Sequence, residues 1–379
     1  MTRSDNVKIK SVIIKNRDEI LNSTAYTSPN TDIKTRPAWR LPVWALIIID
    51  VLIAALILSV FSYFHLGIAG EEEGEPMVMV TPVYTPSPAP DYEPAETEPN
   101  GEVPEPTIDP ANMTWAQKFA EHFTETVVVS ENAYSSPNVS ITIEKMTKGE
   151  GREQITYYVA NIYISKIECF QTYLAKGKYG SGKEEVLDMH IASGALLAMS
   201  GDYYNSANST LRNVVIRNGH AYKVNNTSLE VCVLYYDGVM ETFGRKEFND
   251  KDVRAAAEER GIWQAWTFGP SFLDDEGKAR ESFKNVTPYQ MKEHPRAAIG
   301  YYEPGHYCFV VVDGRQTGYS KGVSPFEFAE IFEELGCKVA YNLDGGGSAM
   351  MTYDEKLVNQ ALSGGNRDIG DCLIIVEVE

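Results

Sequence analysis

The sequence has few of the residues that mark several common functional classes. It holds only five cysteines and six histidines in 379 residues. No two cysteines are spaced as CxxC and the histidines are scattered, so no zinc-knuckle or thioredoxin-type motif is present. Lys and Arg are outnumbered 34 to 53 by Asp and Glu, which gives a net charge of -19. Because phosphate backbones need a basic patch, this balance argues against nucleic acid as a partner.

The cysteines predict buried positions. Their odd number leaves at least one unpaired, and most of them have apolar neighbours. We therefore predict small, buried hydrophobic side chains, with one or two disulfides as the alternative. The five are Cys169, Cys232, Cys308, Cys337 and Cys372.

One long apolar segment, residues 44–63, contains a single charged residue, Asp50. Its length of about 20 residues suffices to cross a bilayer as a helix. Residues 1–40 carry eight basic groups and four acids, whereas three Glu residues follow the segment at 71–73. By the positive-inside rule we expect a cytoplasmic tail (residues 1–41), a transmembrane helix (residues 42–69) and an extracellular remainder, with the cell membrane as the location. A cleaved signal peptide is the alternative.

Residues 70–110 have no Lys or Arg, but they hold eleven acids and ten of the nineteen prolines. Such a composition cannot bury enough apolar surface to fold, and its prolines favour an extended backbone. We therefore predict a disordered linker that holds residues 111–379 away from the membrane.

Alternation of apolar and polar residues, typical of strands, dominates the chain beyond the linker. Two segments have helix boundaries instead: residues 250–261 begin at an Asp and end at a Gly, and residues 324–336 begin with Ser-Pro and end at a Gly. A shorter amphipathic helix is expected over residues 112–125. We predict an α+β domain with a mixed or antiparallel sheet and a few packed helices. Strands are expected at residues 140–144, 155–164, 214–216, 231–236, 307–312 and 373–378, and the inward face of the later helix at Phe326, Ala329, Ile331, Phe332 and Leu335.

The segment that says most about chemistry is Asn342-Leu343-Asp344, followed by three glycines and Ser348. Glycines let the backbone turn at positive φ and approach a ligand closely, and exposed N–H groups in such a turn bind anions. A carboxylate beside an anion-binding turn suits a substrate with a phosphate and a bond that needs acid–base help. A strand-to-helix turn without a ligand is the structural alternative. The run is not a Walker A loop, because the GK[ST] ending is absent.

Three further clusters carry polar residues suited to phosphate or sugar chemistry. Asp202 stands before two tyrosines, Arg296 stands at the entry to an apolar stretch, and Asp313 and Arg315 flank a glycine. Near the C-terminus, Arg367 precedes the last expected strand. Arginine binds phosphate bidentately, although each of these arginines taken alone also fits a surface ion pair.

In this order, the motifs GDYY (201–204), PRAAIG (295–300), VVVDGR (310–315), GYSKG (318–322) and NLDGGGSAMM (342–351), closing with Asn359 and Arg367, resemble the phosphodiester glycosidase family. The resemblance covers residues 190–379, and residues 111–190 match loosely. One departure is Met199-Ser200, where members often have Asn or Ala. The resemblance implies catalytic roles for Asp344 and Asp202. It implies substrate or phosphate binding by Arg296, Arg367, Asp313, Arg315, Ser320, Asn342, Gly345, Gly346, Gly347 and Ser348.

The family implies hydrolysis of a sugar-1-phosphodiester, of the N-acetylglucosamine-1-phosphodiester kind, at the anomeric C–O bond. Arg296, Arg367 and the donors of the glycine turn are expected to hold the departing phosphate. Of Asp344 and Asp202, one is expected to act as base or nucleophile, and the other to orient sugar hydroxyls or water. No cofactor is required, and a divalent cation between carboxylates and phosphate stays open.

The expected partners are a phosphosugar or a cell-surface glycopolymer, in exopolysaccharide or in a wall phosphopolymer, besides the membrane itself. Two other classes of function stay open. One is a non-catalytic module that binds wall phosphopolymers through the same arginines. The other is a phosphodiesterase or phosphotransferase that cleaves the P–O bond, which product identity would separate from a glycosidase.

Overall fold

The computed structural model describes residues 52–54, 75–77, 113–202, 213–284, 286–360, 362 and 366–378. The chain divides into two units, residues 1–70 and residues 71–379. The predicted tail, nearly all of the predicted membrane helix and most of the predicted linker lie outside the described residues. Within the described part of the chain, no helix has both the length and the apolar character needed to span a membrane.

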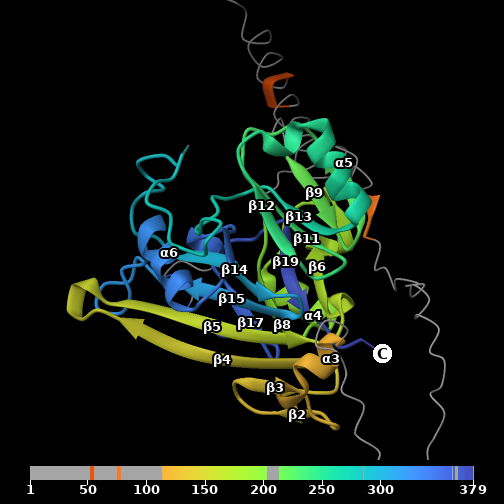
Figure 1. The fold of residues 1–379 in the computed structure, drawn as a ribbon. Helices are drawn as coiled ribbons and strands as arrows, with labels where there is room; N and C mark the ends of the chain where they lie inside the picture. The colour runs from red at the N-terminus through yellow and green to blue at the C-terminus, as the bar shows by residue number, and fades with distance from the viewer. Residues whose placement is uncertain are drawn as a thin grey trace, which may run out of the picture. The chain divides into compact units, whose positions relative to one another are not determined.

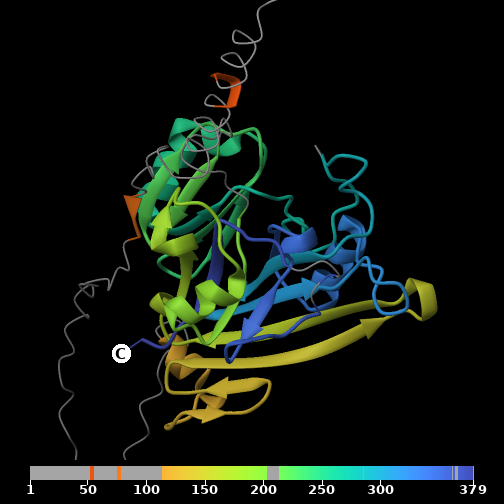
Figure 2. The same ribbon diagram turned by 180° about the vertical axis from the view of Figure 1, so that it is seen from behind.

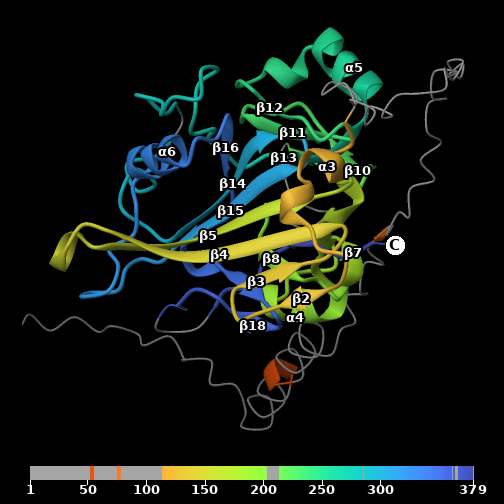
Figure 3. The ribbon, with the colours of Figure 1, turned by 60° about the horizontal axis from the view of Figure 1, so that its bottom comes forward.

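Three large antiparallel sheets form the second unit (Figure 1). The seven-stranded sheet is ordered β16 (Val339–Asn342), β14 (Arg296–Glu303), β15 (His306–Val312), β5 (Ile155–Ile164), β4 (Val139–Lys148), β3 (Ala133–Ser135), β2 (Val128–Val129). Figure 3 shows these strands side by side in this order. The predicted strand at residues 155–164 coincides with β5, and all pairings among the described strands are antiparallel rather than mixed.

Two five-stranded sheets complete the arrangement. One is ordered β10 (His220–Val224), β9 (Val214–Arg217), β13 (Ile262–Trp266), β11 (Val231–Tyr235), β12 (Met240–Phe243). The other is ordered β18 (Lys356–Leu357), β17 (Met351–Tyr353), β8 (Leu197–Ser200), β19 (Asp371–Ile375), β6 (Phe170–Leu174), and α4 (Val186–Ser193) packs beside it. Figure 2 shows the same layers from behind. The α+β prediction with antiparallel sheets is therefore confirmed for this unit.

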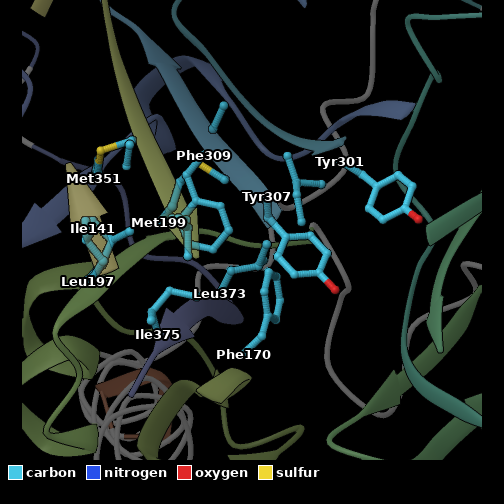
Figure 4. Packing of buried hydrophobic residues seen from close by; sticks show 14 of the residues in the cluster. Ile141, Phe170, Leu197, Met199, Tyr301, Tyr307, Phe309, Met351, Leu373 and Ile375 are labelled. Carbon is cyan, nitrogen blue, oxygen red and sulfur yellow. The ribbon is translucent and has the colours of Figure 1, made fainter. Parts of the chain in front are cut away.

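The seven-stranded sheet is buried on both faces at β15, which is why this strand reads as an unbroken apolar run. Side chains alternate between faces along a strand. Tyr307, Phe309 and Val311 enter the main core, whereas Cys308 and Val310 enter a second core. Figure 4 shows the main core, where Phe309 meets side chains of β6, β8 and β19. Phe170 lies edge-on to Phe309, with ring centroids 5.6 Å apart.

The second core lies under α6 (Pro325–Glu334), which begins and ends as its sequence predicts. Ser324 caps the helix in a capping box with Glu327, and proline occupies its first turn. The expected inward face is wrong at one position: Phe328 is fully buried, whereas Phe326 is 38% exposed. Of the five buried residues, Pro325, Phe328, Ala329 and Phe332 follow the i, i+3, i+4, i+7 spacing of one helical face, and Ile331 is buried beside it. Phe326 falls outside this face.

Two other helix predictions differ in outcome. α5 (Lys251–Arg260) has Asp250 as its N-cap and Gly261 just after its end, as predicted. The helix expected over residues 112–125 is only α3 (Trp115–Lys118), followed by a 3-10 turn over Ala120–His122. The rings of His122, Tyr163 and His306 stack here over the sheet, so packing rather than helix propensity sets this segment.

A short piece of the predicted linker pairs with the domain. β1 (Glu75–Pro76) is antiparallel to β7 (Lys178–Tyr179), and the Met77 N–H donates to the Gly177 carbonyl at 2.9 Å. The Met77 side chain packs against a small cluster that includes Leu174 and Val215. These three described residues therefore have fixed partners, unlike a free spacer.

All five cysteines are buried and unbonded. The Sγ atoms of Cys308 and Cys337 lie 3.7 Å apart, in contact but without a disulfide. The reading as small buried hydrophobic side chains is confirmed.

Candidate active site

Three strands of the seven-stranded sheet each have a terminus at the same edge of the sheet, where β14 begins and β15 and β16 end. The start of β14 pairs with the end of β15, Arg296 opposite Val312, and β14 also pairs with the end of β16, Ala298 opposite Asn342. Antiparallel pairing therefore brings the PRAAIG, DGR and NLDGGGS motifs to the same place, although up to about fifty residues separate them in the chain. A pocket of about 570 Å³ opens at this edge.

The pocket is strongly cationic for so acidic a chain. Its lining includes five basic side chains, Arg245, Lys284, Arg296, Arg315 and Arg367, but only two carboxylates, Glu230 and Asp344. Of the two, Glu230 already accepts from the Ser271 N–H at 2.7 Å and from Arg280 at 3.2 Å. Such a lining favours an anionic ligand.

Arg296 is a buried guanidinium that is held by carbonyl groups only. Its Nε donates to the Val323 carbonyl at 2.8 Å, and its Nη2 donates to the carbonyls of Gln290 and Lys292 at 2.5 and 3.2 Å. No carboxylate lies within salt-bridge distance of it among the described residues. Burial, followed by the charge of Arg315, lowers the pKa of Arg296 to about 10. It remains cationic at neutral pH, and its charge is left for a ligand.

Arg315 lies at the exposed rim of the same pocket wall. Its Nε and Nη2 reach Nδ1 of His294 at 3.3 and 3.1 Å, and its Nη2 also donates to the Tyr289 hydroxyl at 3.1 Å. Its guanidinium also lies against the glycine turn, since a Cβ built on Gly346 would meet Arg315 Nη2 at 3.5 Å.

The glycine turn packs directly on the start of β14. A Cβ on Gly345 would lie 2.9 Å from the Pro295 carbonyl, closer than a side chain tolerates, and Gly346 has a φ of +66°. Larger residues are therefore excluded here. The N–H of Gly346 donates to Pro295 and that of Ser348 donates to Gly345. The N–H of Gly345 interacts with the Asp344 carboxylate. Among the described residues, the predicted anion-binding turn is thus reduced to the N–H group of Gly347.

Asp344 is the carboxylate that faces the pocket beside this turn. Nη2 of Arg367 donates to both its oxygens at 3.0 Å, and Nε of Arg367 donates to the Ser348 hydroxyl at 2.8 Å. Burial raises the pKa of Asp344, against the lowering effect of Arg367. Ser348 itself is fully buried and does not line the pocket, so it orients Arg367 rather than reaching a ligand.

Asp202 lies behind the pocket rather than in its lining. It is fully buried, and Oδ2 accepts from the Thr267 N–H at 2.8 Å and from Arg217 at 3.3 Å. Arg217 also donates to Asp371 at 2.7 Å, and Asp371 accepts from the Asp202 N–H. Burial raises the pKa of Asp202. The backbone links it to the pocket, because the Gly201 carbonyl accepts from the Asp344 N–H at 2.9 Å.

Three other predicted binding residues hold the framework of the site. Asp313 is buried and accepts from Asn359, from the Tyr319 hydroxyl and from the Gln360 N–H. Ser320 donates to the Asp313 carbonyl and accepts from the Thr156 N–H. Neither lines the pocket. Asn342 does line it: its Nδ2 donates to the Gly269 carbonyl, and its buried Oδ1 has no partner among the described residues.

Four residues in or behind the pocket belong to none of the sequence motifs. His294 and Tyr289 belong to a segment with no helical or strand periodicity, and only its position just before PRAAIG marks it. Arg217 directly follows the strand expected at residues 214–216, and Asp371 lies just before the strand expected at residues 373–378. At such positions the sequence does not distinguish a buried, paired charge from an exposed one. The sequence motifs indicate no particular metal ligand. The described residues contain no group of three or more His, Cys, Asp or Glu side chains that could hold an ion.

A model of the phosphodiester glycosidase family matches residues 193–376. The SPbeta prophage-derived uncharacterized protein YomE of Bacillus subtilis (strain 168) is 26% identical over an alignment of 278 residues, which covers 68% of this chain and 42% of that protein. The chain therefore spans less than half the length of this curated relative.

Among solved structures, the fold is similar to the catalytic domain of zebrafish N-acetylglucosamine-1-phosphodiester alpha-N-acetylglucosaminidase, auto-inhibited by its pro-peptide. The TM-score is 0.51 at 18% identity, over 67% of this chain and 88% of that one. At this identity the likeness concerns the fold alone. The family match covers the pocket motifs from PRAAIG to Arg367, as the sequence resemblance predicts. Residues 193–376, just under half of the chain, match the phosphodiester glycosidase family.

Proposed function

We propose that the chain hydrolyses sugar-1-phosphodiesters of the N-acetylglucosamine-1-phosphodiester kind, between the anomeric carbon and the phosphate oxygen. The observation that carries this is Arg296, a buried guanidinium that faces the pocket with carbonyl partners only. A buried cation without a counter-ion is unfavourable unless a ligand supplies the charge. A phosphodiester supplies one negative charge and two oxygens in the geometry that a guanidinium binds.

In the proposed reaction, water adds to the anomeric carbon. The bond between that carbon and the phosphate oxygen breaks, and the oxygen leaves with the phosphate. The products are the free sugar and a phosphomonoester. Asp344 is the carboxylate of the pocket, and as base or nucleophile it must be ionised, a state that Arg367 favours. Arg296 stabilises the negative charge on the departing phosphate. Asp202 is fully buried, so we assign it to support the Asp344 backbone through Gly201.

We further propose that the chain is anchored in the cell membrane by residues 42–69, with the domain outside the cell. This extension is supported by the apolar run and by the basic residues before it. The substrates would then be exopolysaccharide or wall phosphopolymers within reach of the anchored domain.

The test is hydrolysis of an α-N-acetylglucosamine-1-phosphodiester by the full chain in mild detergent. Free sugar and a phosphomonoester are expected as products. Asp344→Asn should lower kcat/KM at least about 100-fold, the usual scale for loss of an acid–base group. Glu230→Gln is the matched control, because that pocket carboxylate is already paired with Arg280. An Asp344→Asn enzyme as active as the parent chain would contradict the assignment.

A second function has one observation in its favour. Asp202 is outside the pocket lining and Glu230 is paired with Arg280, so Asp344 is the single candidate catalytic carboxylate among the described lining residues, fewer than the usual glycosidase pair. A module that binds phosphopolymers needs the arginines alone. Binding of phosphosugar polymers with no release of sugar would favour this alternative, and release of a sugar phosphate would indicate P–O cleavage.

A further inference from the structure

The pocket holds its guanidinium groups in two different ways. Arg367 donates to the carboxylate of Asp344 at 3.0 Å from each oxygen, so much of its charge is neutralised. Arg315 has no carboxylate within salt-bridge distance among the described residues. Its side-chain acceptors are the Nδ1 atom of His294 and the hydroxyl of Tyr289. The two arginines are therefore unequal as anion ligands, although the sequence motifs give them equal weight.

The hydrogen bonds of His294 define its neutral form. Its Nε2 lies 2.8 Å from the Tyr289 carbonyl, which can only accept, so Nε2 carries the proton. Nδ1 is then left as a lone pair that faces Arg315. The charged groups near the ring are Arg315, Arg296 and Glu293. Burial, together with the two arginines, lowers the pKa of His294 and keeps the ring neutral.

The backbone at this position is fixed independently of the imidazole. The N–H and carbonyl of His294 exchange hydrogen bonds with Val323 at 3.1 and 3.0 Å. Gly322 packs so closely on the His294 backbone that a Cβ there would lie 2.6 Å from it. A change of the side chain alone should therefore leave the course of the chain intact.

We infer that His294 is a positioning residue that aims Arg315 into the pocket with a neutral acceptor, so that an anionic phosphoryl group binds between Arg296 and Arg315 rather than at Arg367. This rests on the proposed function for the nature of the substrate. The glycine turn lies beside the Arg315 guanidinium, since a Cβ built on Gly346 would be in van der Waals contact with Arg315 Nη2 at 3.5 Å. An acidic residue at position 294 would hold Arg315 equally well but would neutralise its charge.

That difference gives the test, with three substitutions in the full chain. His294→Asn keeps a neutral acceptor, His294→Asp keeps an acceptor but adds a charge, and His294→Leu removes the acceptor. The probes are inorganic phosphate, by calorimetry, and the methyl diester of α-N-acetylglucosamine-1-phosphate, by the KM of hydrolysis. We expect His294→Asn to stay within about threefold of the parent chain, and His294→Asp and His294→Leu to weaken phosphate binding about tenfold or more. His220→Asn, on β10 and paired with Glu75, is the matched control.

The outcomes separate the two proposals. Phosphate binding in the expected order without any hydrolysis would retain the anion site and reject the glycosidase. Equal phosphate affinity of the Asn and Asp variants would show that the charge at position 294 is irrelevant, and would overturn the inference even if the diester is hydrolysed. Absence of phosphate binding by the parent chain would overturn it as well. Melting temperatures close to that of the parent chain would exclude misfolding as the cause of a loss.

Discussion

At the scale of single residues, the site is governed by which charges have partners. Arg367 and Asp344 neutralise each other, whereas Arg296 and Arg315 face the pocket with neutral acceptors. Arg217 lies between two carboxylates, Asp202 and Asp371, and all three side chains are fully buried. This triad has two carboxyl groups and a single guanidinium group, so one of the carboxyl groups readily stays protonated.

The triad predicts a pH dependence of stability. Burial, the largest effect, raises the pKa of Asp371 to about 6, whereas an unfolded Asp titrates near about 3.9. Between about pH 4 and 6 the folded chain therefore binds more protons, and the stability contributed by this group falls as pH rises through that window. Asp371→Asn should flatten that fall. Urea unfolding of the full chain at pH 4, 5, 6 and 7 measures the free energy of unfolding. If this free energy varies with pH in the same way in the parent chain and in Asp371→Asn, the assignment to Asp371 is refuted.

At the scale of elements, packing overrides sequence pattern at a few defined places. Residues 250–261 and 324–336 form the helices that their caps predict, because capping is local and needs no partner. The inward face of α6 and the short α3 depend instead on the sheet beneath them. β1 is a clearer case, since Glu75–Met77 find partners on β7 and on the Gly177 carbonyl within a segment whose composition predicts none.

The two phenylalanines of α6 give a matched test of that face. Phe328 is fully buried in the second core, whereas Phe326 is 38% exposed two residues earlier. Phe328→Ala should lower the free energy of unfolding by about 3–5 kcal/mol through the cavity that it leaves. Phe326→Ala should cost less than about 1 kcal/mol. Chemical unfolding of both variants measures the two losses. A larger loss for Phe326→Ala than for Phe328→Ala would support the inward face expected from the sequence.

At the scale of the whole molecule, three separate apolar cores hold all five cysteines out of water. Burial raises the pKa of Cys169 to about 12, and it raises the pKa of Cys232 and Cys372 well above the ordinary range. Thiol reactivity therefore depends on opening of the fold rather than on any local exposure.

This predicts that the native full chain takes up maleimide only as fast as it unfolds. Denatured chain should take up five labels, one for each cysteine. A Lys246→Cys variant, at an exposed position in the turn that follows β12, should react at once and serves as the positive control. A thiol that reacts rapidly in the native parent chain, or fewer than five labels after denaturation without reductant, would contradict the unbonded, buried arrangement.

Local sequence patterns were enough to predict an α+β domain with a mixed or antiparallel sheet, six of its strands, two helices with their caps, and the family resemblance of residues 190–379. These follow from local signals: alternation, capping residues, and ordered motifs. The sequence also placed Arg296, Arg315, Asn342, Asp344, the glycine turn and Arg367 in one set, and the structure brings all of them to one pocket.

Which members of that set face the pocket depends on contacts between distant segments. Asp202, Asp313, Ser320 and Ser348 belong to the same ordered set of motifs as the lining residues but are turned into the interior. There they form hydrogen bonds with Arg217, Asn359, Thr156 and Arg367 respectively. His294 enters the site only because β14, β15 and β16 each have a terminus at the same edge. Burial and the partner of a charge are properties of contacts between distant segments, and no spacing along the chain encodes them.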